Sequence, residues 1–92
     1  MNTPDFESFS RQARAEGFDE VIERRWEPLT ELATHTHPFA VKALVTQGQL
    51  WLTVDGQTQA LQTGDWFELA REVPHEERYG PAGATYWVAR RN

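Results

Sequence analysis

The chain has 92 residues, enough for one small domain and too few for two independent cores. Its 9 Lys and Arg residues against 14 Asp and Glu residues give a net charge of −5, which argues against binding to nucleic acid or to an anionic membrane surface. The absence of cysteine excludes a disulfide framework and any thiolate ligand or nucleophile. Because no signal peptide or membrane-spanning run is evident, we expect a cytoplasmic protein.

Residues 1–17 are predicted to form one short helix that packs on a larger domain. Thr3 is a candidate cap, and Pro4 suits the first helical position, with acidic residues in the first turn. Gly17 is a good stop signal. The apolar residues form a narrow stripe along one face: Phe6, Phe9 and Ala13.

Residues 18–92 alternate between short strand-like segments and sharp turns. Eight strands are predicted: Glu20–Trp26, Thr30–His37, Phe39–Thr46, Gln49–Asp55, Thr58–Leu61, Trp66–Leu69, His75–Tyr79 and Thr85–Ala89. Turns are expected between them, including Gln47-Gly48 and Gly80–Gly83. Asp55-Gly56 is the strongest hairpin signal, because a type I′ turn needs a positive φ at both central residues. This pattern favours an all-β jelly roll, which leaves few free strand edges.

Three histidines carry the strongest chemical signal. His35 and His37 are one residue apart in an extended segment, so a strand through them would point both imidazoles to one side. His75 follows Pro74 in a second extended segment. Neutral imidazoles that converge from two strands are typical ligands of a divalent transition metal. We therefore predict a metal site formed by the three histidines; the alternative is that they occupy a polar strand face.

Two stretches resemble the two motifs of the cupin superfamily, as found in its small single-domain members. The first motif, a His-x-His pair followed by a glycine, corresponds to His35–Gly48, and the second, from a glycine to a Pro-His pair, corresponds to Gly64–His75. The resemblance covers residues 30–88. It implies that residues 18–92 form a double-stranded β-helix barrel with a pocket at its mouth. It also implies a homodimer and a divalent metal such as Fe, Ni, Zn, Mn or Cu.

The chain departs from the family pattern at the usual fourth ligand. The glutamate of the superfamily should fall near Val41 or Lys42, and neither side chain is a normal metal ligand at neutral pH. By strand parity Val41 is expected to face inwards. The resemblance therefore implies a three-histidine centre, which some members of the superfamily use for oxygen-dependent chemistry.

Glu77 and Tyr79 follow His75 at intervals of two residues, so all three share one face if the strand is regular. Glu77 is the candidate fourth ligand or general base, with a solvated carboxylate as the alternative. Tyr79 is the candidate to place a hydroxyl in the pocket, or simply to fill it. These two residues are the predicted catalytic side chains.

Four other residues are assigned by their place in the pattern. Trp51 and Trp66 fall on the strand faces opposite the core, and we expect them at the interface of a homodimer. Arg90 and Arg91 are expected to form a solvated tail, although an arginine near a pocket mouth can recognise a carboxylate.

These features predict a metal-binding cupin that acts on, or binds, a small polar molecule. As an enzyme it would use the metal as a Lewis acid or oxygen-activating centre, and dioxygenase-like and isomerase-like reactions are both open. The sequence also resembles the effector-binding barrels found ahead of helix-turn-helix domains in transcription regulators. The second hypothesis is therefore a non-catalytic small-molecule sensor that works through a protein partner. The third hypothesis is a metal-free structural barrel, because the glutamate that usually completes the ligand set of the superfamily is absent.

Overall fold

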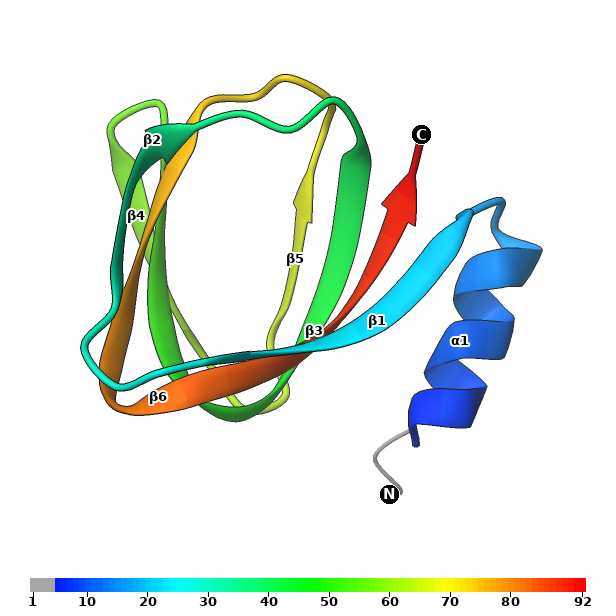
Figure 1. Ribbon diagram of the computed structural model, residues 1–92, viewed down its shortest axis with the longest axis horizontal. Coiled ribbons are helices and arrows are strands. Elements are labelled where there is room, and N and C mark those ends of the chain that lie inside the picture. Colours follow the sequence, from blue (N-terminus) through cyan, green and yellow to red (C-terminus); the bar gives the residue numbers. More distant parts are fainter. Residues whose placement is uncertain (1–4) are drawn as a thin grey trace.

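The computed structural model describes residues 5–92 and shows a closed barrel of strands with one helix on its outside (Figure 1). The elements in chain order are α1 (Phe6–Ala15), β1 (Glu20–Trp26), β2 (Glu31–His35), β3 (Ala40–Val54), β4 (Gln57–Gln62), β5 (Trp66–Leu69) and β6 (His75–Arg91). This is the predicted double-stranded β-helix with a short N-terminal helix. Within residues 5–92, no helix has the length and apolar character needed to cross a membrane.

The two long strands, β3 and β6, each take part in both layers of the barrel. The second half of β6 lies between β1 and the first half of β3, which also pairs with β5. The first half of β6 lies between β2 and the second half of β3, which also pairs with β4. All of these pairings are antiparallel, so the two long strands join the layers into one continuous wall.

The expectation of eight separate strands is wrong, because two of the predicted turns lie inside the long strands. At Gln47-Gly48 the register shifts, but β3 stays paired with β6 on both sides of the shift. The residues Gly80–Gly83 have no register partner on β1, β2 or β3, so β6 bulges there. Pro81 suits such a bulge because it has no N–H to donate to a neighbouring strand. In a sequence, glycine and proline are found both where a strand bends and where a turn joins two strands, so the two cases give the same signal.

The barrel is filled by side chains that alternate inwards along the strands. Its buried apolar residues come from β3, β4, β5 and β6: Val41, Ala43, Val45, Leu50, Leu52, Leu61, Phe67, Leu69, Tyr79, Ala84, Tyr86 and Val88. The predicted Asp55-Gly56 hairpin joins β3 to β4, with φ of 53° and 76° at the two residues. Both angles are positive, as a type I′ turn requires.

Helix α1 packs on the outer face of the layer that contains β1 and β6. Asp5 is its cap, because the Asp5 carboxylate accepts a hydrogen bond of 2.7 Å from the backbone N–H of Ser8. Asp5 was expected in the first turn instead. The predicted cap Thr3 and first helical residue Pro4 lie outside the described residues. The helix stripe joins a second buried cluster: Phe9, Ala13, Phe18, Leu44 and Ala89.

The two outward-facing tryptophans differ in their surroundings. Trp66 stacks on Phe9 of the helix, with ring centroids 5.8 Å apart, and remains 47% exposed. Trp51 lies on the outer face of the other layer, beneath the guanidinium of Arg78 at 4.8 Å. Their predicted role in a homodimer stays a prediction.

Gly48 lies where the bends of β3 and β6 meet. Its φ is +77°, and a Cβ atom added there would collide with the carbonyl oxygen of Gly83 and lie 2.8 Å from the Cα of Ala84. Gly83 has a φ of +70°, and a Cβ atom on it would collide with the carbonyl oxygen of Trp26. The backbone of β6 can therefore approach β3 closely only because Gly48 lacks a side chain, and can approach the end of β1 closely only because Gly83 lacks one.

We predict that Gly48→Ala destabilises the protein much more than Gly56→Ala. Gly56 also has a positive φ, of +76°, but a Cβ atom there meets open space. Gly56→Ala should therefore cost only the backbone strain, about 1–2 kcal/mol. Gly48→Ala adds a backbone collision worth about 1–3 kcal/mol more. Urea unfolding of both variants measures the difference, and equal costs would show that the strand crossing is not tightly packed.

Candidate metal site

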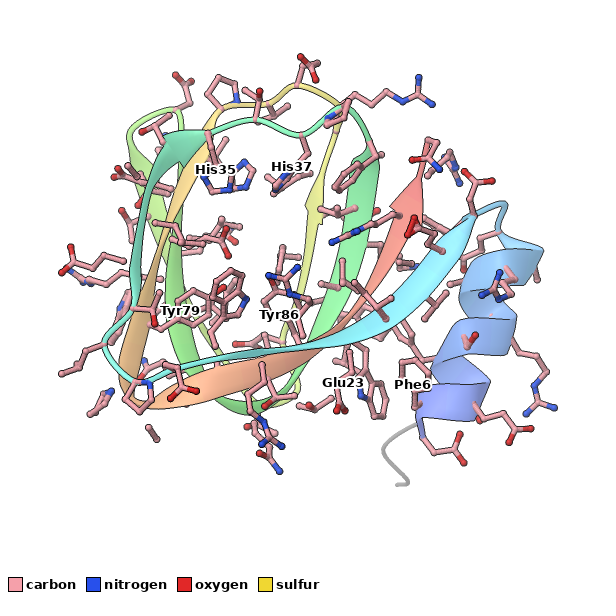
Figure 2. All side chains as sticks on the ribbon, in the orientation of Figure 1. Phe6, Glu23, His35, His37, Tyr79 and Tyr86 are labelled. Atoms are coloured by element: carbon pink, nitrogen blue, oxygen red, sulfur yellow. The ribbon has the colours of Figure 1, made fainter. Side chains whose placement is uncertain are left out.

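The three histidines lie together inside one end of the barrel. His35 ends β2 and is the register partner of His75, the first residue of β6. The ring centroids of His35 and His75 are 4.3 Å apart, and the ring of His37 lies 4.9 Å from the first and 5.0 Å from the second. One ligand nitrogen of each lies within 4.8 Å of the others. Figure 2 shows His35 and His37 pointing into the barrel. The predicted convergence of three imidazoles is confirmed.

Backbone carbonyls fix the orientation of two of the rings. The Nδ1 of His35 lies 2.8 Å from the carbonyl oxygen of Ala33, and the Nδ1 of His75 lies 3.0 Å from that of Val73. A carbonyl oxygen only accepts, so each Nδ1 carries the proton. The Nε2 atoms of both rings are left with free lone pairs, which is the arrangement that orients metal-ligating imidazoles in proteins.

His37 is held by a different contact. Its ring stacks on Phe39, with centroids 4.9 Å apart and an interplanar angle of 8°. Burial lowers the pKa of His37, and the neighbouring rings of His75 and His35 lower it further. The imidazole of His37 is therefore neutral at neutral pH, and its lone pair is available to an ion.

The carboxylate of Glu77 lies beside the imidazoles. Glu77 is 8% exposed, and its Oε2 is 3.5 Å from the Nε2 of His35 and 3.7 Å from the Nε2 of His75. These separations exceed those of good hydrogen bonds. The other oxygen, Oε1, accepts a hydrogen bond of 2.5 Å from the hydroxyl of Tyr79. Oε2 is thus the oxygen of Glu77 that remains for an ion or a small molecule.

Tyr79 is not among the residues that line the cavity, and Figure 2 shows it farther down the barrel than His35 and His37. Its side chain is 1% exposed and stacks on Trp26, whose Nε1 donates a hydrogen bond of 3.0 Å to the hydroxyl of Tyr86. Burial raises the pKa of Tyr79, and Tyr86 and Glu77 raise it further. The phenol therefore stays protonated and donates a hydrogen bond to the Glu77 carboxylate.

A small cavity of about 110 Å³ contains the three imidazoles and Glu77. Its walls also include apolar and aromatic side chains: Leu32, Phe39, Val41, Phe67, Leu69, Val88, Trp26 and Tyr86. Val41 faces into this cavity as predicted, in the region where the family carries its glutamate. The neighbouring Lys42 points outwards, and its Nζ lies 2.9 Å from the Oε1 of Glu16.

Two arginines also line the cavity, Arg24 from β1 and Arg90 from β6. The expectation that Arg90 belongs to a solvated tail is wrong, because β6 continues to Arg91 and alternation turns Arg90 inwards. Arg91 is held as well: it donates a hydrogen bond of 2.7 Å to the carbonyl oxygen of Glu16. Sequence reasoning missed Arg24. Its signal was the alternation of Ile22, Arg24 and Trp26 along one strand face.

Sequence comparison matches residues 19–90 to the family of AraC-like ligand binding domains. The comparison with curated proteins finds no match to this chain.

Solved structures with the same fold include three that illustrate its range. An RmlC-like cupin from Shewanella frigidimarina NCIMB 400 is 21% identical, with a TM-score of 0.67 over 78% of this chain and 65% of that chain. A conserved protein with a double-stranded beta-helix domain from Klebsiella pneumoniae subsp. pneumoniae MGH 78578 is 22% identical, with a TM-score of 0.66 over 77% of this chain and 64% of that chain. A structure described under the DMSP lyases RdDddP and RnDddQII is 18% identical, with a TM-score of 0.72 over 78% of this chain and 37% of that chain.

At these identities the solved structures establish a shared fold and no shared activity. This chain spans less than two thirds of the length of each of the three. The family match covers residues 19–90, which contain all of β1 to β5, nearly all of β6 and all three histidines. The chain therefore belongs to the family of AraC-like ligand-binding domains and has the cupin fold.

Proposed function

We propose that the barrel binds a divalent transition metal through His35, His37 and His75 and holds a small polar molecule beside it. The observation that carries this proposal is the convergence of three imidazole nitrogens within 4.8 Å in an interior cavity. The chain has three histidines in all, and every one of them is in this cluster.

The donor set suits such an ion. Imidazole nitrogen is a common ligand of Fe, Ni, Zn, Mn and Cu, and nitrogens within 4.8 Å of one another need only small side-chain movements to share an ion at bonds of about 2.1 Å. His35 and His75 already present their Nε2 atoms, because their Nδ1 protons are engaged by carbonyls. A bound ion of this kind supplies Lewis acidity to a molecule held beside it.

Glu77 is the proposed fourth ligand, and the alternative role is a general base. The geometry that supports both is the same, since Oε2 faces the imidazoles while Oε1 is occupied by Tyr79. Tyr79 is then a positioning residue, which acts by fixing the carboxylate. The carboxylate that the family usually supplies from the strand of Val41 is supplied here from β6.

Ligand sensing is the second candidate function. The match to AraC-like ligand binding domains favours it, because that family is described by ligand binding. A sensor of this type would pass its signal to a partner protein. We also propose that the chain forms a homodimer, as the resemblance to cupins implies. Both functions use one cavity and one metal site, so they differ only in whether the bound molecule is converted.

We predict that His35→Ala greatly reduces metal binding. The purified protein should contain about one equivalent of metal per chain, and the variant should contain much less, because His35→Ala removes one of the three imidazole ligands and no other histidine in the chain can replace it. Elemental analysis of the purified proteins measures this. Thr36→Ala is the matched control, since Thr36 lies between the two histidines in sequence but is exposed. Metal-free wild-type protein that does not take up an ion would contradict the proposal.

Glu77→Gln separates the two roles of the carboxylate. If Glu77 is a ligand, the variant should lose metal affinity by about 10-fold or more, whereas Glu76→Gln, on the exposed side of the same strand, should not. Unchanged metal affinity in Glu77→Gln, measured by titration of the metal-free protein, would reject the role of ligand and leave that of base.

We predict that Tyr79→Phe destabilises the protein by about 1.5–3 kcal/mol at neutral pH, the usual value of a hydrogen bond to a charged group. The reason is that Oε1 of Glu77 loses its buried donor. Urea unfolding of a double-mutant cycle with Glu77→Gln measures the coupling between the two side chains. Additive effects of the two changes would show that the phenol does not position the carboxylate.

Conversion and sensing are separated by a turnover screen. We predict that the metal-loaded protein transforms at least one member of a panel of small thiols, diols and keto acids, followed by oxygen uptake and by product analysis. His35→Ala should be inactive in the same assay. Binding without any conversion across the panel would favour the sensor.

A further inference from the structure

Two positive charges face the interior of this barrel. Arg24 lies on the β1 face that also carries Ile22 and Trp26, and Arg90 lies on the β6 face that carries Tyr86 and Val88. Both guanidinium groups are stacked on aromatic rings. The Cζ of Arg24 is 4.7 Å from the ring centroid of Trp26, and the Cζ of Arg90 is 4.7 Å from that of Phe39.

These arginines are poorly paired within the protein. Among residues 5–92, Arg24 makes no ion pair. The nearest carboxylate to Arg90 is that of Glu20, whose Oε1 lies 3.9 Å from an Nη atom, beyond hydrogen-bonding distance. The Nε of Arg90 is buried and has no hydrogen-bond partner in the described part of the chain. Since a buried unpaired donor is costly, its retention needs a reason.

The charges of the cavity do not balance. Glu77 is the one carboxylate among the lining residues, and its oxygens face Tyr79 and the imidazoles. Two guanidinium groups and one carboxylate leave a net charge of +1 before any metal is counted, and a divalent ion raises it further. An anionic molecule in the cavity would balance this charge, although both arginine side chains are also partly exposed to solvent.

We propose that the cavity binds a small carboxylate, with the anionic group held by Arg24 and Arg90 and the rest of the molecule directed towards the histidines. The planar guanidinium group matches a carboxylate with two parallel hydrogen bonds. The cavity volume of about 110 Å³ lies well below that of drug-sized pockets, and its apolar walls suit a short carbon chain. This inference rests on the proposed function only for the position of the metal, because the two arginines line the cavity whether or not a metal is bound.

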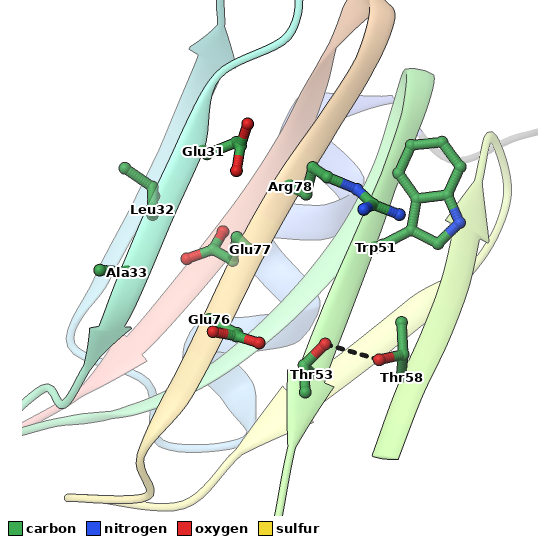
Figure 3. A pocket seen from close by; sticks show the side chains of 9 residues that line it. All are labelled: Glu31, Leu32, Ala33, Trp51, Thr53, Thr58, Glu76, Glu77 and Arg78. Carbon is green, nitrogen blue, oxygen red and sulfur yellow. Dashed lines mark hydrogen bonds between the residues drawn. The ribbon is translucent and has the colours of Figure 1, made fainter. Parts of the chain in front are cut away.

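A second pocket contains an arginine that also stacks on a tryptophan but is exposed to solvent, unlike Arg24 and Arg90. It lies on the outer face of the barrel and is lined by Glu31, Glu76 and Arg78 among others (Figure 3). Arg78 also stacks on a tryptophan, Trp51, but it is exposed to solvent. Exposed charges need no partner. Arg78 is therefore a matched control for the interior arginines.

The experiment is calorimetric titration of the purified full-length protein with propionate, its neutral analogue propionamide and inorganic phosphate, with metal content measured on the same samples. Propionate should bind saturably at one site per chain, and propionamide should bind at least about tenfold more weakly, because it lacks the charge. Phosphate should bind more weakly than propionate. No saturable binding of propionate up to about 10 mM, equal binding of the amide, or tighter binding of phosphate would overturn the inference.

Variants assign the binding to the arginines. Arg90→Gln and Arg24→Gln should each weaken propionate binding by about tenfold or more without loss of metal, whereas Arg78→Gln should leave it unchanged. Thermal unfolding shows whether each variant is folded, and either interior arginine suffices for the test. Unchanged affinity in a folded interior variant would overturn the proposal.

The outcomes also separate this inference from the metal proposal. Propionate binding in a protein that takes up no metal would leave the arginine site standing and reject the metal site. Metal binding without propionate binding would do the reverse.

Discussion

The antiparallel pairing of β2 with the first half of β6 is the interaction on which the site depends. Its register places His35 directly opposite His75, so that two imidazoles from distant parts of the chain meet without any loop rearrangement. Because strand side chains alternate, a slip of one residue would turn these rings to the outside. Near the middle of β6, Gly83 lies against Gly48 of β3, and this close contact between the two long strands is possible because Gly48 has no Cβ atom.

Strand β6 supplies most of the chemistry of the cavity. Its inward face carries His75, Glu77 and Tyr79 at one end and Tyr86 and Arg90 at the other, because a single period of two residues continues on each side of the bulge. The site therefore keeps a carboxylate even though β3 presents a valine at the usual place. The same strand connects a proposed metal ligand with a proposed anion-binding residue.

The sequence predicted those features that follow from parity and short-range spacing. The Asp55-Gly56 hairpin and the inward direction of Val41 are of this kind. The histidine cluster was predicted too, but the predicted strand Thr30–His37 was too long, because β2 ends at His35 and His37 lies beyond it. It did not predict that β3 and β6 are continuous, because tertiary pairing carries each strand across residues that locally favour a turn. Arg24 and Arg90 were missed or misread because arginine normally indicates an exposed position, and these two are partly buried only because the barrel closes around them, which no local pattern reveals.

The most direct test of this account is the X-ray absorption spectrum of the metal-loaded protein, compared with that of His37→Ala. We expect the wild-type spectrum to show three imidazole ligands with additional oxygen scatterers, and the variant to show two imidazoles or no bound metal. A wild-type spectrum with fewer than three imidazoles would contradict the claim that His35, His37 and His75 share one ion.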